Sequence, residues 1–291
     1  MIEGSPPMNI QITAASRYVR ELLASHKQGT VHSVYRKTIN LSLGGQLVAL
    51  QAADSPLSPI SLITPLTAQE LELLSIQTKD CVSISSDVIQ VGQRCCFSIR
   101  KAASVNLKLS SSLSDDELSV LERHIFSALA ARDAGSFELL FFQPRTACEI
   151  PFLAAAGRHL LDASQALRLS DWEAAARAFG GLIGLGPGLT PGGDDFLCGI
   201  LAGLILCSID RHPLSIILHE TIDKNLVNTN QISAAFLQCA LEGQFSGAVC
   251  SLTAMPSPEE ILSSFLKIGH SSGTDTLCGI AYLLQNRRLL K

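Results

Sequence analysis

A glycine-rich run at residues 184–195, GLGPGLTPGGDD, constrains the fold of this chain more than any other feature. It combines five glycines, two prolines and two adjacent aspartates. Glycine permits backbone conformations that other residues resist, and proline fixes φ, so such a run forms a shaped loop rather than core. The segment that follows, residues 196–204, is almost wholly apolar and is predicted to be a buried helix. The loop therefore places Asp194 and Asp195 at the start of an apolar helix.

Residues 273–280 form a second copy of this loop–helix junction. They align with residues 193–200 without a gap and share glycine, aspartate, leucine, cysteine, glycine and isoleucine at equivalent places. An aspartate beside a buried helix is costly unless it has partners or a chemical role. We therefore expect two equivalent loop–helix segments that face each other, with Asp275 as the counterpart of Asp195. Chance similarity between two glycine-flanked core helices is the alternative.

The composition indicates extensive burial. Of 291 residues, 47% are hydrophobic and only 16% are charged. The longest strongly apolar stretch, residues 196–209, is shorter than the roughly 20 residues that span a bilayer. The first residues lack the basic start and apolar core of a signal peptide. We expect a cytoplasmic protein that does not act on a membrane.

The net charge and the pattern of cysteines argue against a nucleic-acid-binding, disulfide-bonded or zinc-binding protein. The net charge is −4 and the chain has no long basic run, so nucleic acid is not an expected partner. The nine cysteines are scattered and form no C-x-x-C pair, which is typical of reduced thiols rather than disulfides or a zinc site. Cys198 and Cys278 occupy matched positions of the two copies. Apolar neighbours raise a thiol pKa, so we expect a core role for both rather than a nucleophilic one.

The chain changes character near residue 112. Before it, short segments rich in β-branched residues alternate with turn signals, at 30–41, 46–51, 60–64, 81–85, 88–91, 95–99 and 105–109. After it, the apolar residues follow a helical period, and capping boxes at Ser114 and Ser170 open two of the helices. We predict an α+β fold in which a small β-barrel or sandwich, residues 1–112, precedes a mostly α-helical domain, residues 113–291.

The loop at residues 184–195 has the composition of an anion-binding site. Thr190 is predicted to cap the following helix, whose first backbone N–H groups favour anions. Three glycines, Gly186, Gly188 and Gly193, would let the backbone approach a phosphate or carboxylate closely.

The aspartates oppose an anion, and their role stays open. In one interpretation Asp194, Asp195 and Asp275 hold a divalent cation such as Mg²⁺ against a phosphorylated ligand. In another, the acids cap the helix and bind a neutral, hydrogen-bonding part of the substrate. In a third they only cap a buried helix and complement its dipole. The spacing does not decide between these.

Two further polar segments complete the candidate site. The loop at residues 269–276 offers Ser272, Gly273 and Thr274 as hydrogen-bonding groups, and His270 as either an acid–base residue or a structural one. Residues 228–233 place Asn230 and Ser233 before a helix, where they could bind an amide or ureide group or cap that helix. No Ser-His-Asp order of a nucleophilic triad is recognisable.

These motifs resemble the AllH family. The resemblance is carried by the run at 184–195, by TNQIS at 229–233 and by SGTDTL at 272–277, with weaker support from 40–41 and 59–62. It extends over roughly residues 30–285. One departure is Gly192, which stands where the resemblance leads us to expect a small hydroxyl residue such as serine.

The resemblance implies a transferase subunit: an oxamate carbamoyltransferase component that acts with an FdrA-like subunit and a third protein. The implied reaction interconverts oxalurate plus phosphate with oxamate plus carbamoyl phosphate, late in allantoin breakdown and purine catabolism. In this interpretation the glycine-rich loop holds phosphate, the hydroxyls orient the carbamoyl or oxamate group, and the three aspartates are catalytic and hold Mg²⁺.

Two other functions are kept as alternatives. The chain could be a ligand-sensing or structural subunit whose partner performs the chemistry. Residues 273–277 also weakly resemble a metal-binding segment of the Mg²⁺-dependent ADP-ribosylglycohydrolases, but the rest of that motif set is missing.

Overall fold

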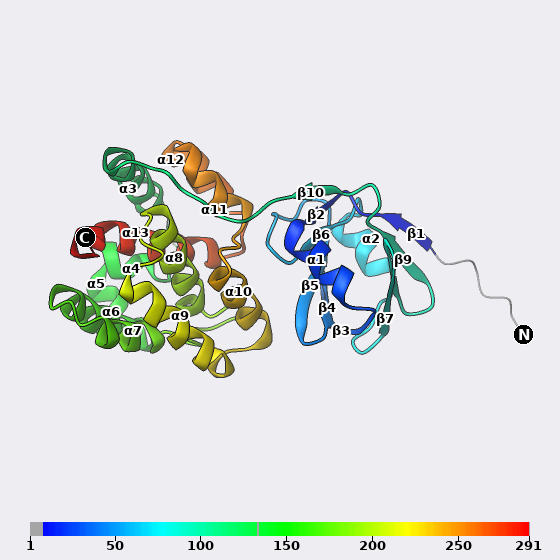
Figure 1. The fold of residues 1–291 in the computed structure, drawn as a ribbon, viewed down its shortest axis with the longest axis horizontal. Helices are drawn as coiled ribbons and strands as arrows, with labels where there is room; N and C mark the ends of the chain where they lie inside the picture. The colour runs from blue at the N-terminus through cyan, green and yellow to red at the C-terminus, as the bar shows by residue number, and fades with distance from the viewer. Residues whose placement is uncertain (1–7, 133, 291) are drawn as a thin grey trace, which may run out of the picture. The chain divides into compact units, whose positions relative to one another are not determined.

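The computed structural model describes residues 8–132 and 134–290. The chain separates into two compact units, Met1–Leu107 and Lys108–Lys291 (Figure 1). The first, the β unit, is a curled sheet, and the second, the helical unit, is mostly α-helical, which confirms the predicted α+β fold. The sequence had placed the change of character after residue 112.

The strands of the β unit form one sheet of ten strands in the described residues, in the order β1-β9-β8-β7-β3-β4-β5-β6-β2-β10. Their bounds are β1 Met8–Gln11, β2 Ala14–Ser16, β3 Gln28–Tyr35, β4 Thr38–Leu43, β5 Gln46–Gln51, β6 Ser61–Ile63, β7 Cys81–Ser85, β8 Val88–Val91, β9 Cys95–Ser98 and β10 Ala103–Val105. The segment predicted as one strand at 30–41 is two strands, because the chain turns between Tyr35 and Thr38.

The order of the strands requires the sheet to curl. β1 is the first strand of the order and β2 is next to the last, yet only Ile12 and Thr13 separate them in the chain. The Ile12 N–H donates to Ser98 O at 2.8 Å, and the Thr13 N–H donates to Ile63 O at 2.8 Å, so this short link joins both ends. Ile12 is fully buried inside the curl with Phe97. Two short helices that the sequence did not predict, α1 (Arg17–Ser25) and α2 (Ala68–Leu73), complete the unit.

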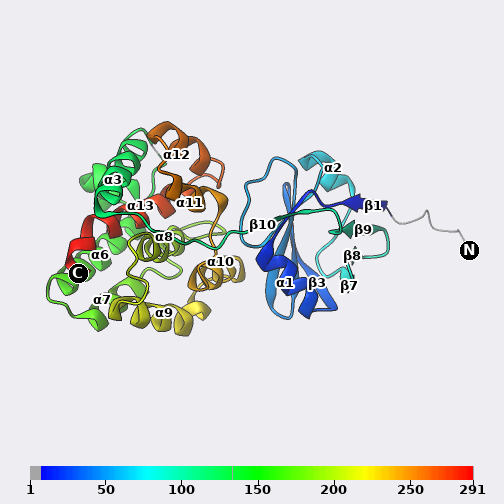
Figure 2. The ribbon, with the colours of Figure 1, turned by 45° about the horizontal axis from the view of Figure 1, so that its top comes forward.

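The helical unit is built around α8 (Gly192–Leu206) and α13 (Ser272–Asn286), which lie against each other at its centre (Figure 2). One side is covered by α3 (Asp115–Ala130) and α12 (Pro258–Phe265), and the other by α7 (Trp172–Gly180), α9 (Pro213–Asn225) and α10 (Gln231–Leu241). The remaining helices are α4 (Glu138–Phe142), α5 (Pro144–Glu149), α6 (Pro151–Arg168) and α11 (Gly247–Ser251). No helix in the described part of the chain is long and apolar enough to cross a membrane.

The two central helices touch backbone to backbone. A Cβ placed on Gly199 would lie 2.1 Å from the carbonyl oxygen of Thr276, and one placed on Gly279 would lie 2.0 Å from that of Phe196. Real atoms never approach so closely, so only glycine fits at either position. The repeated glycine of the two sequence copies is therefore the crossing point of α8 and α13.

Side-chain caps fix the starts of several helices. The Ser114 capping box with Glu117 is present at the start of α3, as predicted. The second predicted box was wrong: α7 is capped by Asp171, whose carboxylate accepts from the Ala174 N–H at 2.9 Å. Ser170 has a φ of 54° and ends the preceding turn, so its hydroxyl is not placed to cap α7.

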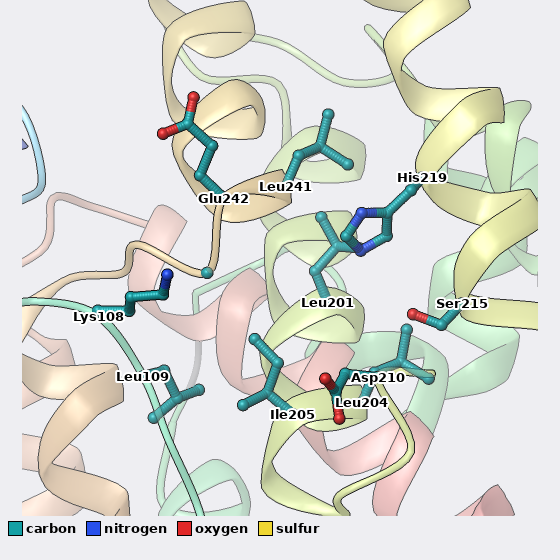
Figure 3. Close-up of a pocket in the computed structure, with 11 residues that line it drawn as sticks. Lys108, Leu109, Leu201, Leu204, Ile205, Asp210, Ser215, His219, Leu241 and Glu242 are labelled. Atoms are coloured by element: carbon teal, nitrogen blue, oxygen red, sulfur yellow. The ribbon is translucent and has the colours of Figure 1, made fainter. Parts of the chain in front are cut away.

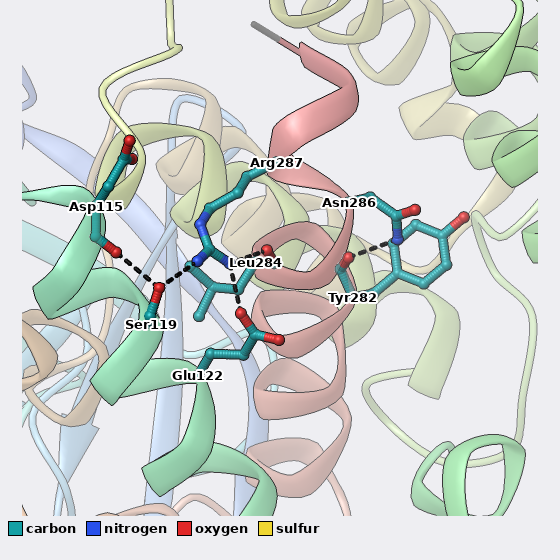
Figure 4. Close-up of polar contacts among 7 residues, drawn as sticks. All are labelled: Asp115, Ser119, Glu122, Tyr282, Leu284, Asn286 and Arg287. Carbon is teal, nitrogen blue, oxygen red and sulfur yellow. Dashed lines mark hydrogen bonds and ion pairs between the residues drawn. The ribbon is translucent and has the colours of Figure 1, made fainter.

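The far end of α13 is anchored to α3 by a buried arginine (Figure 4). Arg287 forms an ion pair with Glu122 and donates from Nη2 to the Ser119 hydroxyl at 2.8 Å. A buried guanidinium needs such partners, because an unpaired buried charge is strongly destabilising. This contact holds α13 in register along α3.

Candidate functional site

Three loops of the helical unit meet at the starts of α8, α10 and α13. The Thr190 and Ser272 hydroxyls lie 2.8 Å apart and join the glycine-rich loop to the loop before α13. The Asn230 side-chain amide donates to Leu189 O at 2.9 Å and joins the glycine-rich loop to the segment before α10. The structure thus brings together the three segments that the sequence analysis singled out.

Asp194 is fully engaged by the protein. It is 1% exposed and accepts three hydrogen bonds, from the Gly184 N–H at 2.8 Å, the Thr229 hydroxyl at 2.5 Å and the Ser233 hydroxyl at 2.7 Å. Hydrogen bonds to a charged group are among the stronger ones in proteins. Asp194 therefore ties the start of the glycine-rich loop to the segment before α10, and it does not cap its own helix.

Asp195 and Asp275 are buried but only partly engaged. Oδ2 of each has no hydrogen-bond partner among the described residues, although Asp195 is 9% exposed and Asp275 is 0% exposed. The other oxygen of Asp275, Oδ1, accepts from the Phe137 N–H at 3.0 Å. A Cβ on Gly192 would lie 2.9 Å from Asp275 Oδ2, so this free oxygen faces the start of α8.

Burial raises the pKa of Asp195 well above its ordinary value, and the neighbouring charge of Asp275 raises it further. The hydroxyls of Ser272 and Thr190 act in the opposite direction, because they hydrogen-bond the ionised form. Loss of solvation, rather than the adjacent carboxylate, is the larger cause.

Burial also raises the pKa of Asp275, to about 7. The Ser136 hydroxyl and the Phe137 N–H oppose this shift, and the charge of Glu138 adds to it. Two carboxyl groups with raised pKa values beside each other hold a proton near neutral pH far more readily than exposed aspartates do. The two carboxyl groups can also bind a cation, which would neutralise the repulsion between their negative charges.

The starts of α8 and α13 carry no side-chain cap. Pro191 and Ser271 occupy the N-cap positions, and neither makes a capping hydrogen bond. The prediction that Thr190 caps α8 was wrong, because Thr190 lies one residue before the cap and its hydroxyl contacts Ser272 instead. Helix starts without a side-chain cap offer backbone N–H groups and the positive end of the helix dipole to a ligand.

Arg132 and residues 134–138 also belong to the site, and the sequence analysis missed them. Arg132 donates from Nε to the Thr274 hydroxyl at 3.3 Å and from Nη2 to the backbone oxygen of His270 at 2.6 Å. Glu138 is buried and accepts from the Ala134 N–H at 2.7 Å. No sequence motif marks this segment, because the contacts of Arg132 with the loop before α13 are made with residues more than a hundred positions away.

Two family models match the chain. The model described as the AllH family N-terminal domain matches residues 10–105, and the model described as oxamate carbamoyltransferase subunit AllH matches residues 182–284. The chain belongs to the AllH family. The second match runs from just before the glycine-rich loop to near the end of α13, and so includes all three loops of the site. No solved structure matches the chain.

Not every predicted site residue of this AllH-family chain faces a ligand. The polar atoms of Asn230 and Ser233 are engaged within the protein: Asn230 caps α10, and Ser233 donates to Asp194. Gly193 and Gly273 pack closely on backbone carbonyl oxygens. Gly188 differs from these, because it is exposed and no atom lies within 4 Å of the Cβ position.

The remaining predicted residues also differ in whether they are engaged within the protein or exposed. The hydroxyl of Thr274 accepts from Arg132, and His270 is exposed and contributes a backbone oxygen. Gly186 has a φ of 123°, in the region that favours glycine, and lies close to the backbone nitrogen of Gly192. Gly186 therefore shapes the loop just before α8.

Of the matched cysteines, Cys278 lies in the core and Cys198 is partly buried and packs against it. Burial raises the pKa values of Cys198 and Cys278 well above the ordinary thiol value, and nearby aspartates raise them further. A thiolate is the reactive form, so both thiols are poor nucleophiles at neutral pH. This agrees with the core role expected from their apolar neighbours.

A metal site made of all three aspartates is not present in the described residues, where no group of three or more histidine, cysteine, aspartate or glutamate side chains could hold a metal ion. Asp194 is taken up by its three protein donors. Asp195 and Asp275 alone keep free carboxylate oxygens, and Mg²⁺ in proteins is commonly held by one or two carboxylates together with substrate phosphates.

Proposed function

We propose that this chain is a subunit of an oxamate carbamoyltransferase and binds a small anionic substrate where its three loops meet. The substrates would be those of the reaction itself: carbamoyl phosphate, phosphate, and oxamate or oxalurate. The single observation that carries the proposal is the pair of free, buried oxygens of Asp195 and Asp275 beside two uncapped helix starts. The family description, oxamate carbamoyltransferase subunit, supports this choice of reaction.

The hydrogen-bonding groups suit a carbamoyl group or a carboxylate. Thr190 and Ser272 present hydroxyls at the junction of the two loops, and the start of α13 presents backbone N–H groups. At the start of α8, the N–H groups of residues 193–195 already donate to backbone oxygens. Fixed donors aimed at an oxygen that gains negative charge are usually the largest catalytic contribution in acyl transfer. Holding two small anions next to each other lowers the barrier further by proximity.

The carboxyl groups require charge compensation before an anion can bind. A Mg²⁺ ion held by Asp195 and Asp275 would offset the charge of a bound phosphate, and their free oxygens fit that role. A proton on either carboxyl group would reduce the repulsion as well, and the raised pKa values favour it. Asp194 would take no part, because its hydrogen bonds hold the loop in shape.

The partners in this proposal are an FdrA-like subunit and a further subunit of the same transferase. The site of this chain has several acidic side chains and one half-buried arginine, Arg132, beside it. A complex that transfers a carbamoyl group between two anions would need further positive groups. The partner subunits are the natural source of these groups.

The test is turnover by the reconstituted complex with Asp195→Asn in this subunit. We expect carbamoyl phosphate formation from oxalurate and phosphate to fall by about a hundredfold or more, as for other losses of charge or donors at reacting groups. Asp223→Asn, on the exposed surface of α9, is the matched control and should leave turnover unchanged. Near-normal turnover with Asp195→Asn would overturn the proposal.

Calorimetry separates the transferase subunit from a sensing subunit. Carbamoyl phosphate is titrated into the isolated chain, with and without Mg²⁺, and then into the complex. A transferase subunit should bind carbamoyl phosphate weakly when it is alone, and more tightly when Mg²⁺ and its partners are present. Turnover should increase under the same conditions. Tight binding that leaves turnover insensitive to Asp195→Asn would identify a sensing role instead.

A further inference from the structure

A cavity lies in the helical unit around the C-terminal half of α8, the half away from the candidate site (Figure 3). Its volume is about 220 Å³. The walls come from the C-terminal half of α8, the start of α9, the end of α10 and the segment at Lys108 and Leu109. None of the loops of the candidate site contributes to it, so the two places are distinct.

The inner wall of this cavity is apolar except for one hydroxyl. The apolar side chains are Leu109, Leu201, Leu204, Ile205 and Leu241. Ser215 is 1% exposed, its hydroxyl has no hydrogen-bond partner among the described residues, and it points into the cavity in Figure 3. A buried hydroxyl without a partner costs about 1–3 kcal/mol, so a molecule that bonds it would recover that free energy.

The rim of the cavity is charged, with an excess of acid. Asp210 and Glu242 are exposed carboxylates, and Lys108 is the exposed cation among the lining residues. His219 completes the rim; burial lowers its pKa, and the charge of Asp210 opposes that shift, so it is largely neutral at pH 7. The lining thus carries one more negative than positive charge and favours a cationic group over an anionic one.

We propose that this cavity binds a small organic amine. Its apolar body packs between the leucines, its ammonium group lies at the rim near Glu242, and a polar group at its other end bonds the Ser215 hydroxyl, which lies on the opposite side of the pocket from Glu242 in Figure 3. An apolar cavity of about 150 Å³ accommodates benzene, so a cavity of about 220 Å³ accommodates a substituted aromatic ring or a short branched chain.

Three probes of similar shape separate the parts of this proposal. Tyramine carries the ring, the amine and a hydroxyl; phenethylamine lacks the hydroxyl; 3-(4-hydroxyphenyl)propionate replaces the amine by a carboxylate. Titration of the full chain, followed by calorimetry or NMR, should show tyramine binding more tightly than either of the others. Binding of the propionate equal to or tighter than that of tyramine would overturn the assignment.

Ser215→Ala tests the buried hydroxyl. This variant only removes an unpartnered group and should fold normally, and it should weaken tyramine binding by roughly three- to tenfold while leaving phenethylamine unchanged. Asp195→Asn serves as the control for the other site and should leave tyramine binding unaltered. Unchanged tyramine affinity in Ser215→Ala, loss of binding in Asp195→Asn, or no saturable binding of tyramine at millimolar concentration would each contradict the proposal.

Discussion

The two loop–helix segments, residues 184–206 and 269–286, share a packing plan but differ in how their loops are held. In both, a glycine at the helix start lies against a carbonyl oxygen: a Cβ on Gly193 would be 2.0 Å from Leu182 O, and one on Gly273 would be 2.1 Å from Phe265 O. The shared glycines therefore let the start of each helix pack directly against a backbone carbonyl oxygen. The shared residues also place Asp195 and Asp275 at equivalent positions.

The residues that differ anchor each loop to a different part of the unit. At the position after the shared glycine, Asp194 accepts three protein hydrogen bonds, whereas its counterpart Thr274 accepts one long bond from Arg132. The first loop is thus held by its own aspartate, and the second by Arg132 and Phe137 from a different segment of the chain. In both loops, one carboxylate oxygen of the repeated aspartate, Asp195 or Asp275, has no hydrogen-bond partner among the described residues.

The largest expected effect concerns the pH dependence of stability. Asp275 has a pKa of about 7 in the folded protein, against about 3.9 in an unfolded chain. Between these values the folded state holds a proton that the unfolded state has released. The contribution of Asp275 to the free energy of unfolding is therefore fully present below about pH 4 and is lost by about pH 7, a change on the order of 4 kcal/mol. Urea unfolding across this range should show that decline.

Asp275→Asn should remove most of this decline. The readout is the difference between variant and parent, because His212 and His219 have lowered pKa values and contribute the opposite slope. Asp195 contributes in the same direction as Asp275, so a residual decline should disappear in the double variant. A pH profile of Asp275→Asn parallel to that of the parent would mean that Asp275 titrates normally.

The second prediction tests the close packing of α8 against α13 at their repeated glycines. Gly199→Ala puts a Cβ 2.1 Å from a backbone oxygen of α13, which neither helix can move away from cheaply. We expect a loss of about 3 kcal/mol in the free energy of unfolding. Gly157→Ala in α6 is the control, since the nearest atom is a flexible leucine methyl group at 3.4 Å. Its stability should stay within about 1 kcal/mol of the parent, and a similar loss in both variants would refute the close crossing.

The third effect tests the difference between the two anchors. Asp194→Ala leaves the Gly184 N–H and two hydroxyls without their acceptor and should cost about 2–3 kcal/mol. Thr274→Ala loses one long hydrogen bond and should cost about 1 kcal/mol or less. Thermal or urea unfolding of both variants gives the comparison. Equal costs would show that the loops are held alike.

The smallest effect is the coupling across the site. Thr190 and Ser272 join the two loops through a single hydrogen bond. A double-mutant cycle with Thr190→Val and Ser272→Ala should give a coupling free energy of about 0.5–1 kcal/mol. Strict additivity of the two changes would mean that the loops are not linked through these hydroxyls.

The sequence predicted the segments of the site better than the roles of single residues. Repetition of glycine and aspartate marked α8 and α13, because close helix contact and burial of a carboxyl group restrict residue choice strongly. Thr190 was assigned to the wrong partner, since its contact with Ser272 joins loops far apart in the chain. Arg132 and Glu138 were not predicted, because in the sequence they look like ordinary polar residues until their partners are known.

Short elements were missed for a related reason. α4 and α5 are one to two turns long, too short for a helical period to stand out. The strands β1 and β2 are only a few residues long, and their places, at one end of the strand order and next to the last strand at the other, depend on the curl of the sheet. In each case long-range packing, rather than local preference, determines the structure.

The most direct test of the proposed site is a crystal structure of the chain, or of its complex, with carbamoyl phosphate and Mg²⁺ bound. The account predicts ligand oxygens within hydrogen-bond distance of Thr190 and Ser272, and a cation or a proton-bearing group against the free oxygens of Asp195 and Asp275. A ligand bound elsewhere, with both carboxyl groups still without partners, would contradict it.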